Sequence, residues 1–85
     1  MDKPVRRKDL LGRQVADEWM IYDASGKAVH VLNETARFVW DRCDGEHGVD
    51  DIVTEAVALY EISETEARED ILECLASFAE LSILD

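Results

Sequence analysis

The sequence predicts a small α+β domain in which three short antiparallel strands precede three helices. Two observations lead to this class. Residues 18–22 and 27–32 are rich in aromatic and β-branched residues and flank a turn sequence, which is typical of a hairpin. Apolar residues then recur at helical spacing in three later segments, residues 34–42, 49–60 and 63–81. A length of 85 residues suits one domain with a modest core.

Residues 1–13 are expected to be a basic, partly flexible lead-in to a single domain over residues 14–85. The lead-in carries the chain's one proline, and Leu10 and Leu11 are its expected anchor onto the body. Its five basic and two acidic residues give a net charge of +3, against −14 for the rest. Such a stretch is either a short interaction arm or, more often, an ordinary solvated terminus. A short first strand is expected over residues 14–16.

The hairpin turn is expected at residues 23–26, Asp-Ala-Ser-Gly, where the aspartate suits the first position and the glycine can take a positive φ. The returning strand is apolar on both faces. Val29 and Val31 lie on one face, and Ala28 and Leu32 on the other. A strand of this kind is either covered on both sides or available to a partner.

The first helix is expected to begin directly after this strand. Asn33 stands at the N-cap position, where its side-chain oxygen can accept from backbone N–H groups of the first turn. Four residues share one helical face: Ala36, Val39, Trp40 and Cys43. Two glycines in residues 44–48 end this helix. The second helix, over residues 49–60, carries two aspartates in its first turn, where the helix dipole favours negative charge.

The third helix is expected to open with a capping box, in which Ser63 serves the N–H of Glu66 and the glutamate reaches back. Its apolar stripe comprises Ala67, Ile71, Cys74, Leu75, Phe78 and Leu81, with Leu72, Ala76 and Ala79 as a flank. This arc is wider than one packed neighbour requires, so the helix can face the core and a groove together. The order of elements is winged-helix-like.

The sequence carries little that indicates an enzyme, a cofactor or a metal. Cys43 and His47 have the one metal-like spacing, and a structural zinc site needs about four ligands. The two cysteines are expected to be reduced and buried. An acidic body repels phosphate backbones and argues against nucleic acid. No apolar run could span a membrane and no secretory signal is evident, so a cytoplasmic location is expected.

Peptide recognition is the function class that remains. An edge strand has unpaired N–H and C=O groups to which an extended peptide can add, and a neighbouring apolar helix can supply side-chain pockets. Residues 29–32 and the third helix fit these two roles. Such a site depends on backbone groups, which explains why no side-chain motif marks it.

The residues from His30 to Ala36, then Val39 and Trp40, Asp44 and Gly45, and Ile52 form an ordered set that resembles the PqqD family. This family is named for pyrroloquinoline quinone (PQQ) biosynthesis protein D. Its pattern has Leu-Asn-x-x-Ala leading a helix, an apolar-Trp pair, Asp-Gly before the second helix and a Leu-rich third helix. The resemblance covers roughly residues 4–84. Ser82 stands where the family usually has glycine near the end of the third helix.

The resemblance implies a recognition element for ribosomally synthesised, modified peptides (a RiPP recognition element) without catalysis of its own. It implies that the leader segment of a precursor peptide adds along the third strand, packs against the third helix and is presented to a modifying enzyme, often a radical S-adenosylmethionine maturase. On this chain the implied peptide-binding residues are Ala28, Val29, His30, Val31, Leu32, Arg68, Ile71, Leu72 and Leu75. Asn33, Ala36, Trp40 and Gly45 match the motif and are interpreted as structural.

Two other functions stay open. A winged-helix nucleic-acid binder is disfavoured by the acidic body, and a purely structural subunit of a maturase would have no affinity for free peptide. A homodimer is also possible, because an exposed edge strand or a hairpin can exchange between chains.

Overall fold

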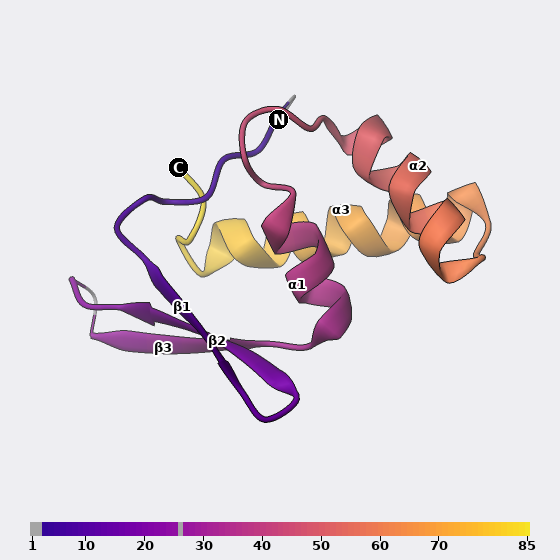
Figure 1. Ribbon diagram of the computed structural model, residues 1–85. Coiled ribbons are helices and arrows are strands. Elements are labelled where there is room, and N and C mark those ends of the chain that lie inside the picture. Colours follow the sequence, from indigo (N-terminus) through magenta and orange to yellow (C-terminus); the bar gives the residue numbers. More distant parts are fainter. Residues whose placement is uncertain (1–2, 26) are drawn as a thin grey trace.

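The computed structural model describes residues 3–25 and 27–85 and has the predicted order of strands and helices (Figure 1). The strands are β1 (Leu11–Val15), β2 (Glu18–Asp23) and β3 (Ala28–Leu32), and the helices are α1 (Glu34–Asp41), α2 (Val49–Tyr60) and α3 (Glu64–Glu80). The predicted α+β class is therefore confirmed. The glycine of the predicted hairpin turn, Gly26, lies outside the described residues.

The first strand differs most from its prediction. It was expected over residues 14–16, but β1 runs from Leu11 to Val15 and pairs along its whole length with β2. Leu11 lies opposite Tyr22, and Val15 lies opposite Glu18. Ala16 has a φ of 54°, which turns the chain and ends the strand one residue earlier than expected. The strand's start depends on pairing with β2, which local sequence does not reveal.

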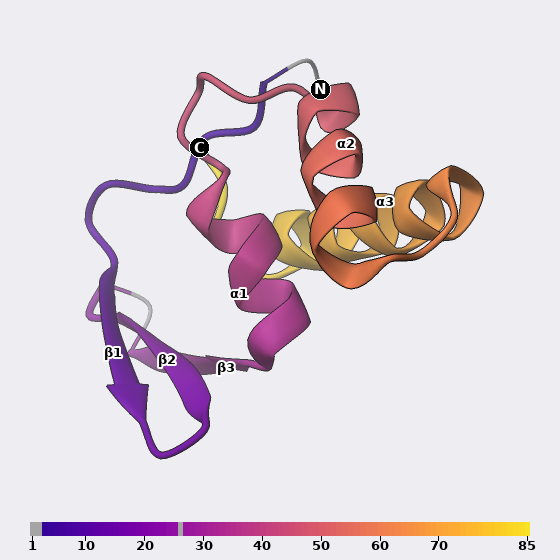
Figure 2. The same cartoon turned by 45° about the vertical axis from the view of Figure 1, so that its right-hand side comes forward.

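The sheet has the antiparallel order β1-β2-β3, and helices cover one of its faces. On that inner face Ile21 of β2 lies between Gly12 of β1 and His30 of β3. Ile21 and Leu32 are buried there. Helix α1 packs on β2 and β3 and also on α3, which in turn packs on α2. In Figures 1 and 2, α1 accordingly stands between the sheet and α3.

The helix starts follow the capping residues that the sequence indicates. Asn33 Oδ1 accepts from the Ala36 N–H at 2.8 Å, which confirms the N-cap of α1. Ser63 Oγ accepts from the Glu66 N–H at 3.1 Å at the start of α3. Gly45, between α1 and α2, has a φ of +81°, a conformation that side chains rarely adopt. These residues fix where each helix begins and how the chain turns between them.

The core lies between the helices and the inner face of the sheet. Edge-to-face ring contacts connect the helices: Trp40 of α1 meets Phe78 of α3 with ring centres 5.5 Å apart, and Phe38 meets Tyr60 of α2 at 5.4 Å. Cys43 is buried in this core, and Cys74 is partly buried. In the described part of the chain, no helix has the length and apolar character to cross a bilayer.

Residues 4–7, which we call the N-terminal arm, connect distant parts of the chain. The arm passes between the loop after α1 and the segment after α3, and its backbone bonds to both. The bonds are Gly45 N–H to Pro4 O at 3.1 Å, Arg6 N–H to Cys43 O at 2.7 Å, Arg7 N–H to Ile83 O at 3.1 Å and Asp85 N–H to Val5 O at 2.7 Å. Both ends of the domain are joined here.

Candidate functional site

Strand β3 is an edge of the sheet. Within residues 3–25 and 27–85 it pairs with one strand, β2, from Ala28 opposite Asp23 to Leu32 opposite Trp19. Backbone N–H and C=O groups of successive strand residues point alternately to either side. Alternate groups of β3 therefore point away from β2, toward a side on which no described strand meets them. This is the backbone arrangement to which an extended peptide can add.

The side chains of β3 alternate between the two faces of the sheet. Val29 and Val31 are each 51% exposed on the outer face, so half of each valine is accessible to a partner. Leu32 is buried on the inner face, and Ala28 and His30 are half-buried. The residues predicted on this strand thus divide into two outward valines and three side chains that face the body.

The residues predicted on α3 divide in the same way. Ile71 and Leu75 are buried, and they belong to the same core as Leu32 of β3. Leu72 is 49% exposed, which leaves it available for contact. β3 and α3 thus both contribute buried side chains to one core, in which α1 packs against each of them, and Leu72, Val29 and Val31 are the exposed apolar members of the predicted set.

Arg68 of α3 faces helix α2. Its guanidinium donates to Asp50 Oδ1 at 2.7 Å and lies 3.6 Å from Glu64 Oε1. The hydrogen bond with Asp50, and then the charges of the two carboxylates, raise the pKa of Arg68. These three residues line a hollow between α2 and α3. The Arg68 side chain is 39% exposed, so it remains partly accessible while it is paired with Asp50.

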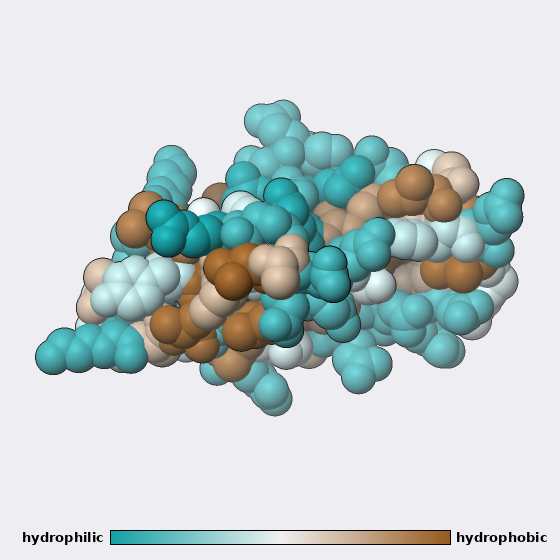
Figure 3. Space-filling model, turned by 60° about the horizontal axis from the view of Figure 1, so that its bottom comes forward, coloured by the Kyte–Doolittle hydropathy of each residue, from teal (hydrophilic) through white to brown (hydrophobic). Residues whose placement is uncertain are grey.

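The outer face of the sheet is more apolar than the sequence analysis anticipated. Its apolar members are Leu11 and Val15 of β1, Met20 and Tyr22 of β2, and Val29 and Val31 of β3. Figure 3 shows hydrophobic side chains gathered over the sheet on this side. All of them except Val31 line a hollow of about 560 Å³, whose lining also includes Arg13. The alternation of Met20 and Tyr22 with Trp19 and Ile21 was the available signal for this face.

The titratable groups with shifted pKa values form ion pairs or lie in the core. The hydrogen bond from His47 lowers the pKa of Asp44 to about 2, and the same bond raises the pKa of His47. Burial raises the pKa of the Cys43 thiol to about 12, so this cysteine is a poor nucleophile at neutral pH. Residues 3–25 and 27–85 contain no group of three or more metal-binding side chains.

Solved structures with this fold include two recorded with peptides. "Lasso peptide synthetase B1 complexed with the leader peptide" matches with a TM-score of 0.87 and 22% identity over 98% of this chain and 98% of that chain. "TbiB1 in Complex with the TbiA(beta) Leader Peptide" matches with a TM-score of 0.83 and 15% identity over 95% and 94%. At these identities the likeness is one of fold. No curated protein is a significant match.

The amino-acid sequence also matches the model of a protein family. The model described as coenzyme PQQ synthesis protein D (PqqD) matches residues 18–84, which extend from the start of β2 to the segment after α3. The motif residues from His30 to Ala36, with Trp40 and Gly45, fall inside this span. The resemblance expected from those residues is confirmed, and the chain belongs to the PqqD family.

Proposed function

We propose that this protein is a non-catalytic peptide chaperone that works in the cytoplasm. It binds the leader segment of a ribosomally synthesised precursor peptide and presents that precursor to a modifying enzyme of natural product biosynthesis. A radical S-adenosylmethionine maturase is the enzyme class that the family resemblance favours. The leader adds as a fourth strand along the free edge of β3.

One observation carries this proposal: in a PqqD-family chain, β3 pairs with β2 alone among the described strands and so forms an edge of the sheet. The two structures of the same fold that are recorded with leader peptides support the ligand class. The net charge of −11 supports a peptide over a nucleic acid, because the body would repel phosphates.

The site uses both backbone groups and side chains to bind the leader. The outward N–H and C=O groups of residues 28–32 provide affinity, and the exposed Val29, Val31 and Leu72 provide apolar contact. Leu32, Ile71 and Leu75 lie in the core and hold strand and helix in position. Arg68 joins the site on release from Asp50, where it pairs with an acidic residue of the leader.

A proline scan of β3 tests strand addition directly. Val29 and His30 are adjacent, so one of them points its N–H to β2 and the other to the free edge. Proline at the outward position keeps the β2 ladder and removes a donor to the incoming strand. Of Val29→Pro and His30→Pro, the variant that stays folded should bind a leader peptide to which the natural chain binds about tenfold more weakly than that chain does. Titration of the ¹⁵N-labelled chain followed by NMR gives both fold and affinity.

Glu69→Gln on the exposed surface of α3 is the control, and its affinity should stay within about twofold of the natural chain. Unchanged leader affinity in a folded proline variant would exclude addition at β3. A chain with no affinity for any free leader would instead fit the purely structural subunit.

A further inference from the structure

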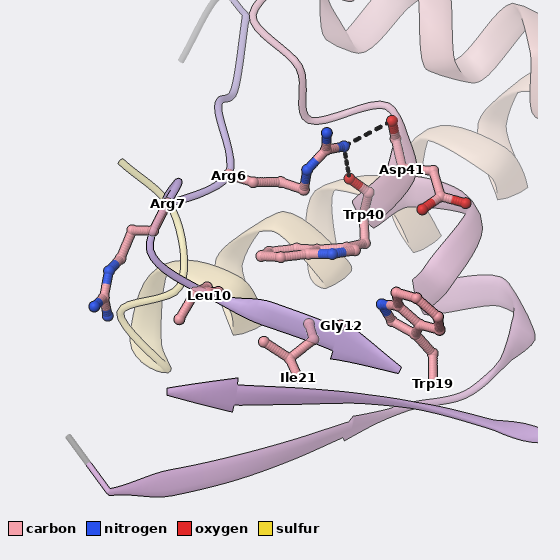
Figure 4. Close-up of a pocket in the computed structure, with 8 residues that line it drawn as sticks. All are labelled: Arg6, Arg7, Leu10, Gly12, Trp19, Ile21, Trp40 and Asp41. Carbon is pink, nitrogen blue, oxygen red and sulfur yellow. Dashed lines mark hydrogen bonds between the residues drawn. The ribbon is translucent and has the colours of Figure 1, made fainter. Parts of the chain in front are cut away.

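The outer face of the sheet is an exposed apolar surface. Helices cover the inner face, where Trp19 and Ile21 of β2 lie on the same side of the strands as Trp40 of α1 (Figure 4). Met20 and Tyr22 alternate with these two residues along β2 and therefore point away from the helices. An antiparallel sheet with one face in the core commonly has polar residues on the other face. This sheet has apolar residues there instead, which indicates a contact surface.

We call this surface the apolar face, and it comprises Leu11, Val15, Met20, Tyr22, Val29 and Val31. Apart from the partly buried methionine, these side chains belong to residues that are between 44% and 68% exposed, and together they leave roughly 500 Å² accessible. Apolar patches of this size on soluble proteins are often binding surfaces. A leader added at the edge of β3 would lie in the plane of the sheet, so the apolar face would remain open.

The apolar face also differs from the rest of the molecule in charge. Among the strand residues that point to this side, two are charged: Arg13 in the middle of β1 and Glu18 at the start of β2, whose formal charges cancel. Both lie at the margin of the face, one on an edge strand and one beside the β1–β2 turn, so their long side chains can reach water. Helices α2 and α3 hold nine carboxylates and one arginine, and they lie on the other side of the sheet, with α1 between the sheet and α3 (Figures 1 and 2).

We propose that a second copy of this chain covers the apolar face, in a weak two-fold dimer in which two outer faces pack together. A two-fold contact uses the same patch on both partners, so the patch must be complementary to itself. An apolar face without net charge meets this requirement, whereas the acidic helices do not. The two sheets also have the same hand of twist, and such sheets pack face to face with strand directions within about 30° of each other.

The size of the apolar face predicts that the dimer is weak. Its burial in both copies would remove about 1,000 Å² from water, which is the lower limit for a specific interface. A dissociation constant on the order of 100 µM is therefore expected. The hollow of about 560 Å³ on this face can receive apolar side chains of the opposing sheet. In this dimer the acidic helices lie on the two outer sides, and each β3 edge stays free for a leader.

Pairing through the β1 edges is the other way in which two copies could join their sheets. If two β1 strands paired about their centres, Arg13 of one copy would lie opposite Arg13 of the other, and like charges directly opposite are destabilising. Packing through the apolar faces avoids this opposition when β1 of one copy lies over β3 of the other. The face-to-face arrangement is therefore favoured.

Sedimentation equilibrium of the full-length chain, at roughly 10 µM to 1 mM, tests the proposal. The natural chain should be mostly monomeric at the lowest concentration and mostly dimeric at the highest. A rise in salt from about 0.05 to 0.5 M should tighten the dimer about threefold or more, because salt screens the repulsion between two copies that each carry a net charge of −11.

The Tyr22→Lys variant separates an apolar contact from general repulsion between charges. Tyr22 lies between Leu11 and Val29 on the apolar face. The lysine makes the chain less acidic, so repulsion alone predicts a stronger dimer, but a charge buried in the contact should weaken the dimer about tenfold or more. Ala76→Lys makes the same change of charge on the exposed surface of α3, and as the control it should retain the dimer.

Spectra of the ¹⁵N-labelled variants verify that each is folded, and Met20→Lys replaces Tyr22→Lys if the latter does not fold. A natural chain that stays monomeric at about 1 mM would overturn the proposal. A dimer that survives the lysine on the apolar face would do so too, and would indicate pairing through the β1 edges. So would a dimer that only Ala76→Lys disrupts, which would lie at α3. A monomeric chain whose outer-face amide signals shift only on addition of a modifying enzyme would assign the face to that enzyme instead.

Discussion

At the scale of single residues, Asp44 organises the loop between α1 and α2. Its Oδ1 accepts from the backbone N–H groups of Glu46 and His47, at 2.9 and 3.2 Å, and lies 3.0 Å from His47 Nδ1. The histidine bond and these N–H bonds favour the carboxylate over the acid, so the pKa of Asp44 falls to about 2. The imidazolium gains from the same contact, which raises the pKa of His47. The pair therefore links the stability of the loop to pH.

His47 should make the folded protein less stable as pH rises past neutrality. Its pKa is higher in the folded chain than in the unfolded one, so its stabilisation is complete below about pH 6.5 and is lost as pH rises through the folded-state pKa. We expect His47→Gln to flatten the dependence of the unfolding free energy on pH between about 6 and 8. Urea unfolding at several pH values measures this slope. If the variant keeps the natural slope, the Asp44–His47 pair is not responsible for it.

The contacts of a single residue were predictable where its partner lies close to it in the sequence. Asn33 and Ser63 bond to groups three residues away, so a local pattern identified both caps. The environment of Trp19 depends on Gly12 and on Arg37, which lies 18 positions further along the chain. Only the fold brings these together, and no local spacing indicates it. The packing of Trp19 against Gly12 and Arg37 was therefore not predicted from the sequence.

At the scale of elements, the helices were predictable and β1 was not, for a physical reason. Each helix buries one face, and its apolar residues recur with the helical period. Strand β1 buries no residue, so its sequence lacks the alternation that marks a strand. Among the expected peptide-binding residues, those on β3 were predictable, because the sequence itself indicates that strand. The orientation of Arg68 toward Asp50 depends on how α2 packs against α3, which the sequence does not give.

The joint between β3 and α1 should depend on the Asn33 cap. Asn33 is exposed, so its replacement removes the bond to the Ala36 N–H and little else. We expect Asn33→Ala to lower the unfolding free energy by about 1 kcal/mol, the usual cost of losing an N-cap. Asn33→Asp should retain natural stability, because a carboxylate also caps and favours the helix N-terminus. Urea unfolding of both variants measures this. Equal losses in the two would show that Asn33 acts through its backbone.

At the scale of the whole molecule, the N-terminal arm closes the domain. Residues 4–7 bond to the loop after α1 and to the segment after α3, regions about forty positions apart in sequence. The Arg7 side chain extends this closure, because it binds the buried Asp23 at 3.0 Å and the Ser82 carbonyl at 2.9 Å. The arm thus also places a basic side chain against a buried carboxylate of the sheet. These hydrogen bonds make the N-terminal arm part of the folded domain.

Removal of the arm should therefore destabilise the whole domain. A chain that begins at residue 8 loses the four backbone hydrogen bonds of the arm, and buried carbonyls such as that of Ile83 lose their donors. At about 0.5–1.5 kcal/mol for each of the four bonds, the unfolding free energy should fall by roughly 2–6 kcal/mol. That is a large share of the stability of a domain this small, so part of the population should be unfolded at 37 °C. A chain that begins at residue 4 keeps every arm contact and is the matched control. Urea unfolding curves for the two truncations give the difference directly, and coincident curves would mean that the arm rests on the body without supporting it.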